Sequence, residues 1–234
     1  MVIKKWLMLS FLLIYLTGCQ PFIGGQSVID WVDFIQWNDH NYTGVLNSEL
    51  ADASFIDKEI GEVRFKVADN VTNSSYQLKD GDAAFHEKGT KLYSIKGEDN
   101  IIAVKDKAAI NGYRIYFAID NSEYKWHFED VSLDQVKKIE IYKSAPPTGN
   151  QQIATISDKA KMENLLEILS NSKDAPAFQP NTSAGDPISY QIILYTDEPT
   201  AYKYGVHYDG NTYFWHPSET AILSGDIQHF ISEK

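Results

Sequence analysis

VKKIEIYKSAPPTGNQQIATISDKAKMENLLEILS, residues 136–170, holds a complete strand–turn–strand–helix unit. Residues 136–143 alternate apolar and polar side chains, which predicts a strand with one buried face. Pro146, Pro147 and Gly149 break this strand, and residues 152–156 return beside it as a second strand. Two antiparallel strands are therefore expected directly before a helix.

The helix is predicted over about residues 158–170, with Ser157 as its N-cap. Its apolar side chains fall at positions i, i+3, i+4 and i+7 and share one face: Met162, Leu165, Leu166 and Leu169. Because a helix with one apolar face needs a surface to cover, we expect this helix to pack on the sheet.

The remaining C-terminal sequence predicts three more strands and a second helix. The strands span residues 189–195, 201–208 and 212–215. Asp209-Gly210 is a strong two-residue hairpin turn between the last two strands. Ser224 caps the final helix, which carries Ile227, Phe230 and Ile231. The order predicts a small α+β domain over residues 130–234, an antiparallel sheet with two helices.

The N-terminal half, residues 30–129, predicts strands and almost no helix. The strands span residues 32–37, 42–46, 60–67, 91–96, 101–104 and 113–119. Polar clusters and glycines separate them, as in successive hairpins, and a turn is expected near residues 48–55. This half is predicted to be a mostly antiparallel β domain, so the fold class of the whole chain is α+β.

The first eighteen residues have the pattern of an export signal. Lys4 and Lys5 form a positive head, and an uncharged run from Trp6 to Leu16 follows. This order is typical of a secretory signal peptide. The run is too short to span a bilayer, which takes about 20 apolar residues. We therefore expect residues 1–18 to be a signal and residues 19–29 to be a tether.

The signal ends in Leu16-Thr17-Gly18-Cys19, which resembles the lipobox of bacterial lipoproteins. The resemblance implies a diacylglyceryl thioether on Cys19 and cleavage between Gly18 and Cys19. The alternative is an ordinary signal with a chance cysteine, but the chain has no other cysteine. Two acyl chains anchor a protein stably, so we expect the protein at the outer face of the cytoplasmic membrane.

Net charge excludes some partners. The whole chain carries −11 at pH 7, and loss of the two signal lysines would leave −13. Nucleic acids require a basic face, so we expect no nucleic-acid partner. An acidic body is also not attracted to anionic lipid. The acidic surface itself is a common solution for solubility.

Several short segments resemble lipoproteins of Bacillus-type Gram-positive bacteria. The segments Val136–Tyr142 and Tyr190–Tyr195, with the terminal Ser-capped helix, make residues 131–232 similar to the extracellular domains called YhfM-like. The segments Ile35–Tyr42 and Gly89–Tyr93 resemble a piece that recurs in similar lipoproteins. The resemblance implies a location and a lineage, and it implies no chemistry.

Metal-binding patterns are weak. His207 and His216 flank the Asp209-Gly210 turn and could face each other across two strands, with Asp209 as a third ligand. The alternative, two surface histidines on a hairpin, is favoured because the spacings typical of zinc sites do not occur. We expect no metal and no cofactor.

Catalytic patterns are weak as well, since no Gly-x-Ser-x-Gly elbow is present. Two acid pairs, Asp80 with Asp82 and Glu129 with Asp130, could act in acid–base chemistry or hold calcium. The calcium pattern is incomplete, and turn residues explain Asp80-Gly81-Asp82 better. No catalytic residue is assigned, so we expect a binding module rather than an enzyme.

Aromatic residues crowd the predicted C-terminal hairpin. Tyr and Trp are enriched at recognition surfaces, and strand alternation gives this set a shared face: Tyr202, Tyr204, Tyr208, Tyr213 and Trp215. One interpretation is a binding face for a sugar or a peptide. The other is an ordinary sheet packed under the predicted helix.

The leading hypothesis is a lipid-anchored, non-enzymatic surface protein that binds an envelope protein or glycan. The competing hypothesis is a cell-envelope hydrolase that uses an acid pair. A deep cleft with two carboxyl groups about 5–9 Å apart would favour the hydrolase. A structural or regulatory role without a small ligand is a third hypothesis.

Overall fold

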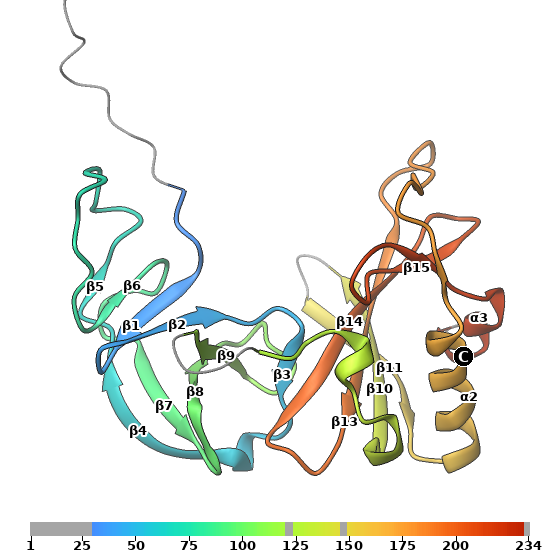
Figure 1. The fold of residues 1–234 in the computed structure, drawn as a ribbon, viewed down its shortest axis with the longest axis horizontal. Helices are drawn as coiled ribbons and strands as arrows, with labels where there is room; N and C mark the ends of the chain where they lie inside the picture. Colours follow the sequence, from blue (N-terminus) through green and yellow to red (C-terminus); the bar gives the residue numbers. More distant parts are fainter. Residues whose placement is uncertain (1–29, 120–123, 146–148, 232–234) are drawn as a thin grey trace, which may run out of the picture.

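The computed structural model describes residues 30–119, 124–145 and 149–231. The predicted signal, Cys19 and the tether lie outside these residues. The described chain forms two lobes, each built on its own sheet (Figure 1). Among the described residues, no helix has the length and apolarity needed to cross a bilayer.

The N-terminal lobe is an eight-stranded sheet of order β4-β7-β8-β9-β2-β1-β6-β5. Its strands are β1 Phe34–Trp37, β2 His40–Gly44, β4 Ile56–Glu62, β5 Phe65–Lys66, β6 Asp82–Ala83, β7 Lys91–Ile95, β8 Glu98–Lys105 and β9 Tyr113–Ala118. The predicted first hairpin is confirmed as β1 and β2. Its turn residues Asn38 and Asp39 both have positive φ, which the tight turns of hairpins require.

This sheet curls round on itself. The strands at its two ends, β4 and β5, are consecutive in the chain and separated only by Val63 and Arg64. The predicted strand over residues 60–67 is therefore broken in two. A Cβ placed on Gly61 would lie 2.0 Å from the Trp37 ring, so a glycine is required where β4 crosses Trp37.

The C-terminal lobe is a second sheet of order β11-β10-β13-β14-β15-β16-β12. Its strands are β10 Lys138–Ala145, β11 Gly149–Ile156, β12 Lys173–Asp174, β13 Ile188–Tyr195, β14 Thr200–Tyr208, β15 Tyr213–Trp215 and β16 Ala221–Ile222. Every β10, β13, β14 and β15 pairing is antiparallel. Within the described part of the chain, β11 pairs with β10 alone, so its other edge is free.

Helix α2, Lys159–Ser170, covers one face of this sheet. Its four predicted apolar residues, Met162, Leu165, Leu166 and Leu169, are all buried, as expected. The N-cap is Asp158 rather than Ser157, because the Asp158 carboxylate accepts the N–H of Lys161 at 3.0 Å. The final helix is short, a 3₁₀ turn Gly225–Ile227 followed by α3 Gln228–Ile231.

One short strand joins the two lobes. The sequence predicts a turn near residues 48–55, but Ser48–Leu50 forms strand β3, followed by a 3₁₀ turn at Ala53–Phe55. β3 pairs antiparallel with the first part of β14, with Ala201 opposite Glu49. Leu50 also packs in the N-terminal lobe beside Ile115. A strand from the first half of the chain thus extends the sheet of the second half.

The mostly-β character of the chain is confirmed. The structure adds three two-residue strands that the sequence did not predict, β6, β12 and β16. Strands of this length carry no detectable alternation, so only their pairing partners define them.

Candidate functional site

Three of the five aromatic residues proposed as a binding face are buried. Trp215 packs edge-on against Phe128 and Tyr204, with ring centroids 4.9 and 5.6 Å apart. The Tyr204 hydroxyl donates to the carbonyl of Trp126 at 3.0 Å. Tyr213 is buried in the same core. Of the two interpretations of the aromatic hairpin, the sheet packed under the helix therefore holds for Tyr204, Tyr213 and Trp215, because they lie in the core that α2 covers.

Tyr202 and Tyr208 keep partial exposure, and both pack against the same core. The Tyr208 ring stacks on Tyr213 at 4.3 Å, and its hydroxyl donates to the carbonyl of Gly210 at 2.9 Å. Burial raises the pKa of the Tyr202 hydroxyl above its ordinary value. These two tyrosines contribute mainly to the lobe's packing and to the hairpin turn.

His207 and His216 lie close together, as predicted, but in the described part of the chain they are not arranged with a third ligand as a metal site requires. The rings of His207 and His216 lie 5.9 Å apart. His207 shares a hydrogen bond with the Ser189 hydroxyl at 2.8 Å, and burial lowers its pKa. The Asp209 carboxylate is occupied by the backbone N–H groups of Asn181, Asn211 and Thr212. Over residues 30–119, 124–145 and 149–231, no three His, Cys, Asp or Glu side chains form a metal-binding group.

The first acid pair is engaged in local structure. Asp80 accepts the N–H of Asn38 at 2.6 Å and forms an ion pair with Arg64 at 3.0 Å. Asp82 is buried and accepts the Tyr76 hydroxyl at 3.0 Å and the backbone N–H of Lys79 at 2.8 Å. These contacts explain why a turn needs acids at both positions.

The second acid pair, Glu129 and Asp130, lies in the 3₁₀ turn Phe128–Asp130 that leads into the C-terminal lobe. Neither residue lines the cleft between the two lobes that is described below. The two acid pairs predicted from sequence therefore do not meet in one site.

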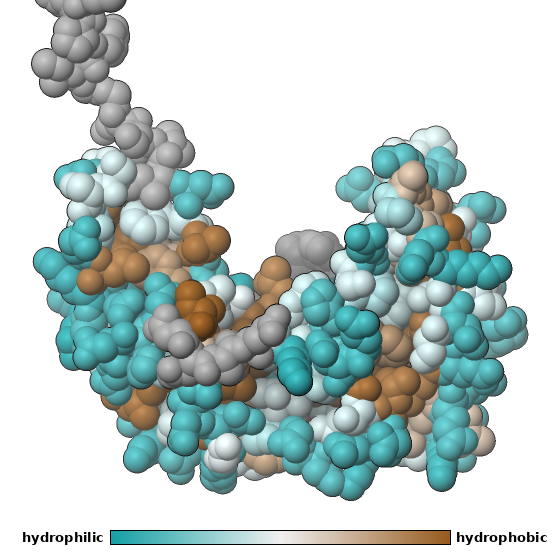
Figure 2. Space-filling view, in the orientation of Figure 1, coloured by the Kyte–Doolittle hydropathy of each residue, from teal (hydrophilic) through white to brown (hydrophobic). Residues whose placement is uncertain are grey.

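A cleft lies at the junction of the lobes, where the space-filling view is hollowed (Figure 2). Its polar part encloses about 400 Å³. The N-terminal lobe lines it with Val45, Glu49, Asp106 and Arg114, and the C-terminal lobe with Asn150, Gln191 and Lys203. Because both lobes supply walls, the cleft exists only in the assembled chain.

An apolar part of about 340 Å³ adjoins the polar part and shares Val45 and Leu46 with it. Aromatic and aliphatic side chains line it: Phe117, Ile119, Tyr124 and Trp126. Leu46 is 70% exposed and Ile119 is 57% exposed, so two large aliphatic side chains lie open to solvent in the lining of one cleft. Ligand sites typically combine such an apolar lining with a few placed polar groups.

Three of the four charged side chains that line the cleft are in ion pairs. Lys203 and Glu49 form an ion pair at 2.7 Å, in which the Glu49 side chain is only 7% exposed. Arg114 forms an ion pair with Asp33 at 2.8 Å. The Asp106 carboxylate caps its own turn by accepting the N–H of Ala108 at 2.9 Å. A ligand would meet a nearly neutral wall, with amides and apolar groups left to contact it.

Contacts beneath the cleft hold its walls in position. The Asn111 side chain donates to the carbonyls of Leu50 and Ala51 at 2.7 and 3.2 Å. It also reaches the Tyr195 hydroxyl at 3.5 Å. Tyr195 donates in turn to Glu140 at 2.7 Å. Hydrogen bonds therefore run from the N-terminal lobe through β3 into the C-terminal sheet.

Sequence reasoning missed a partly buried polar cluster in the N-terminal lobe, centred on the buried Tyr116. The Tyr116 hydroxyl lies 2.5 Å from the His86 ring nitrogen Nε2 and 3.1 Å from Asp33. Burial raises the pKa of Tyr116 and lowers the pKa of His86. The three residues are far apart in sequence, so only the fold brings them together.

No protein-family model, curated protein or solved structure matches the chain.

Proposed function

We propose that the protein is a lipid-anchored binding protein at the outer face of the cytoplasmic membrane, and that it binds its partner in the cleft between its lobes. The anchor would be the diacylglyceryl group on Cys19, after cleavage of residues 1–18. The partner would be a component of the cell envelope. No nucleic acid is proposed as a partner, because the chain carries a net charge of −11.

The observation that carries this proposal is the exposure of Leu46 and Ile119 in a cleft walled by two lobes. Contact of aliphatic side chains with water is unfavourable, so burying them under a partner lowers the free energy of the complex. The polar part beside them offers the amides of Asn150 and Gln191. Such amides both donate and accept hydrogen bonds, so they can fix the orientation of a partner.

A finer description of the fold belongs to this proposal. We propose residues 30–129 and 130–234 as its two domains, the second an α+β unit of the YhfM-like kind. Support comes from α2 packed on a mainly antiparallel sheet. β3 belongs to the first domain and pairs with β14, so without the first domain the sheet of this unit would lack a strand.

The anchor is tested on the protein purified from membranes of the producing bacterium. Intact mass is expected to show loss of residues 1–18 and a diacylglyceryl group on Cys19. Cys19→Ala is expected to release the protein from the membrane fraction. An intact leader, or an unmodified thiol on the processed chain, would refute the anchor.

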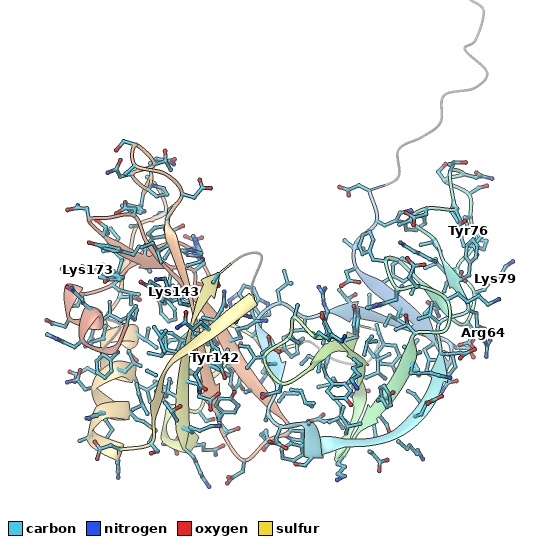
Figure 3. The ribbon with its side chains drawn as sticks, turned by 180° about the vertical axis from the view of Figure 1, so that it is seen from behind. Arg64, Tyr76, Lys79, Tyr142, Lys143 and Lys173 are labelled. Carbon is cyan, nitrogen blue, oxygen red and sulfur yellow. The ribbon has the colours of Figure 1, made fainter. Side chains whose placement is uncertain are left out.

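The cleft is tested by cross-linking in living cells. A photo-reactive amino acid at Leu46 is expected to give a discrete cross-linked species, which Ile119→Asp removes. The control position is Lys173, which lies on the outer side of the C-terminal lobe (Figure 3). Equal cross-linking from Leu46 and Lys173 would show that the cleft is not the binding surface.

A further inference from the structure

We infer that the loop tips of the two lobes, residues 70–78 and 175–185, form a surface that rests against the lipid headgroups, so that the cleft opens toward the membrane. This inference rests on the proposed function, because it needs the chain to be anchored through its N-terminal end.

The first observation is the placement of the tips. Residues 70–78 lie in the segment that connects β5 to β6, and residues 175–185 lie between β12 and β13. In Figure 1 both segments rise at the end of the molecule where the described chain begins, and Figure 2, in the same orientation, shows the hollow between the lobes open on that side. Figure 3 shows the same arrangement from behind, with Tyr76 labelled at one tip.

The second observation is the reach of the proposed tether, residues 19–29. A chain of eleven residues spans at most about 37 Å at full stretch. A compact body of roughly 200 residues has a radius of gyration of about 17 Å. The tether is therefore short relative to the body, and the end that carries Asp30 is held nearest the membrane.

The third observation is charge. Of the whole chain, 23% of residues are charged, yet residues 70–78 and 175–185 contain none. At the chain's average, these twenty residues would carry about four or five charges. The tips are rich in Asn, Ser, Thr and Gln instead. An acidic protein that approaches an anionic bilayer gains most by keeping its acids farther away than a Debye length, about 8 Å.

Two of the acids near the tips are already engaged, whereas Asp174 and Asp186, which border the second tip, are exposed. Asp69 forms an ion pair with Lys66, and the Asp209 carboxylate accepts three backbone N–H groups. Backbone hydrogen bonds hold the pKa of Asp209 below its ordinary value.

Each lobe also carries one exposed apolar side chain near its tip. Val32 is 74% exposed and follows Trp31, which packs against the same buried cluster as Tyr76 and Leu78 of the first tip. Ile188 is 43% exposed and begins β13, directly after the second tip. Small apolar groups beside uncharged polar loops suit the interface between headgroups and water.

The test places a single fluorophore on the lipidated protein. Ser74→Cys and Thr182→Cys label the two tips, where both side chains are exposed. Asp99→Cys and Glu198→Cys label the opposite end, near the β7–β8 and β13–β14 turns (Figure 1). Vesicles of phosphatidylethanolamine and phosphatidylglycerol in equal parts carry a nitroxide-labelled headgroup as the quencher.

Quenching at Ser74 and Thr182 is expected to exceed quenching at Asp99 and Glu198 by about threefold, because a short tether keeps the ends at different heights. The Ser74→Glu, Thr182→Glu pair, with the label at Gln77→Cys, is expected to reduce quenching, and high salt is expected to restore it. Equal quenching at all four positions, or stronger quenching at the opposite end, overturns the inference.

The number of fluorophores per chain distinguishes a wrong orientation from failure of the proposed lipid anchor. A thioether on Cys19 leaves the introduced cysteine as the one reactive thiol, so one label per chain is expected. Two labels per chain would refute the anchor. If the anchor is refuted, the protein is attached through a histidine tag in place of residues 1–19 to a nickel-chelating lipid in the same vesicles. Quenching at the two tips is then compared with quenching at the opposite end, as before.

Discussion

Trp215 lies at the centre of the C-terminal core, although its aromatic neighbours in sequence made it a candidate for a binding face. Its ring contacts Phe128 and Tyr204 edge-on, and the side chain is fully buried. Trp215→Ala is expected to lower the free energy of unfolding by about 3–5 kcal/mol, because it leaves a large cavity. Urea denaturation measures this value.

The matched control is Lys173→Ala, an exposed position on the same lobe, which is expected to change the free energy of unfolding by less than about 0.5 kcal/mol. If Trp215→Ala changed it by no more than the control, Trp215 would not be part of the core.

Glu140 predicts a pH dependence of stability. Burial acts to raise its pKa, but hydrogen bonds from Lys138, Tyr195 and Tyr142 outweigh burial, and the pKa lies below its ordinary value. The folded protein therefore binds this proton less readily than the unfolded chain. The stabilisation is complete above the unfolded pKa of about 4.3 and is lost as pH falls through the lower, folded pKa.

Glu140→Gln is expected to be less stable than the wild type near neutral pH, and the two are expected to converge as pH falls below about 4. Urea denaturation at a series of pH values measures the difference. A difference that stays constant from neutral to acidic pH would contradict this role of Glu140.

Residue patterns predicted shared faces well, and they could not predict the layer that covers each face. Alternation correctly assigns Tyr202, Tyr204 and Tyr208 to one side of a strand. Whether that side is core or surface depends on α2 and on the segment around Phe128, both of which precede β14 in the chain by many residues. Strand alternation alone therefore could not decide between a binding face and a sheet packed under the helix.

At the level of elements, the long and strongly periodic ones were predictable. Helix α2 and the hairpin turn at Asp209-Gly210 lie where the sequence places them. Strand β3 was missed because three residues, Ser48–Leu50, cannot show a period. The cleft was missed for the same reason, since its walls meet only when β3 pairs with β14.

The ion pair between Glu49 of β3 and Lys203 of β14 predicts how this junction responds to mutation. Lys203→Ala leaves a buried carboxylate without its partner and is expected to cost about 3 kcal/mol. The double variant Glu49→Leu, Lys203→Met is expected to recover most of that loss, because it removes both charges and keeps the volume. Chemical denaturation of the wild type, Lys203→Ala and the double variant measures the three stabilities. A double variant as unstable as Lys203→Ala would contradict the explanation.

At the scale of the whole molecule, the shared strand predicts a single unfolding transition. Leu50 packs beside Ile115 in one lobe while β3 is hydrogen-bonded into the sheet of the other. Melting of either lobe exposes this strand, so the lobes are expected to unfold together. Calorimetry is expected to give equal calorimetric and van't Hoff enthalpies.

Ala51→Pro removes the backbone N–H that donates to the Pro199 carbonyl at 2.8 Å, beside the β3–β14 pairing, and is expected to split the single transition into two. Two transitions in the wild-type protein would instead mean that the strand does not couple the lobes.

The free edge of β11 has a consequence for crowded conditions. Its eight residues, Gly149–Ile156, include no lysine, no proline and no acid, the devices by which natural edge strands usually discourage unwanted pairing. At high density in the plane of a bilayer, neighbouring copies would meet along this edge with no electrostatic barrier. Overproduction should therefore form strand-paired aggregates here first, and one added lysine, such as Gln152→Lys, should act as a gatekeeper against them.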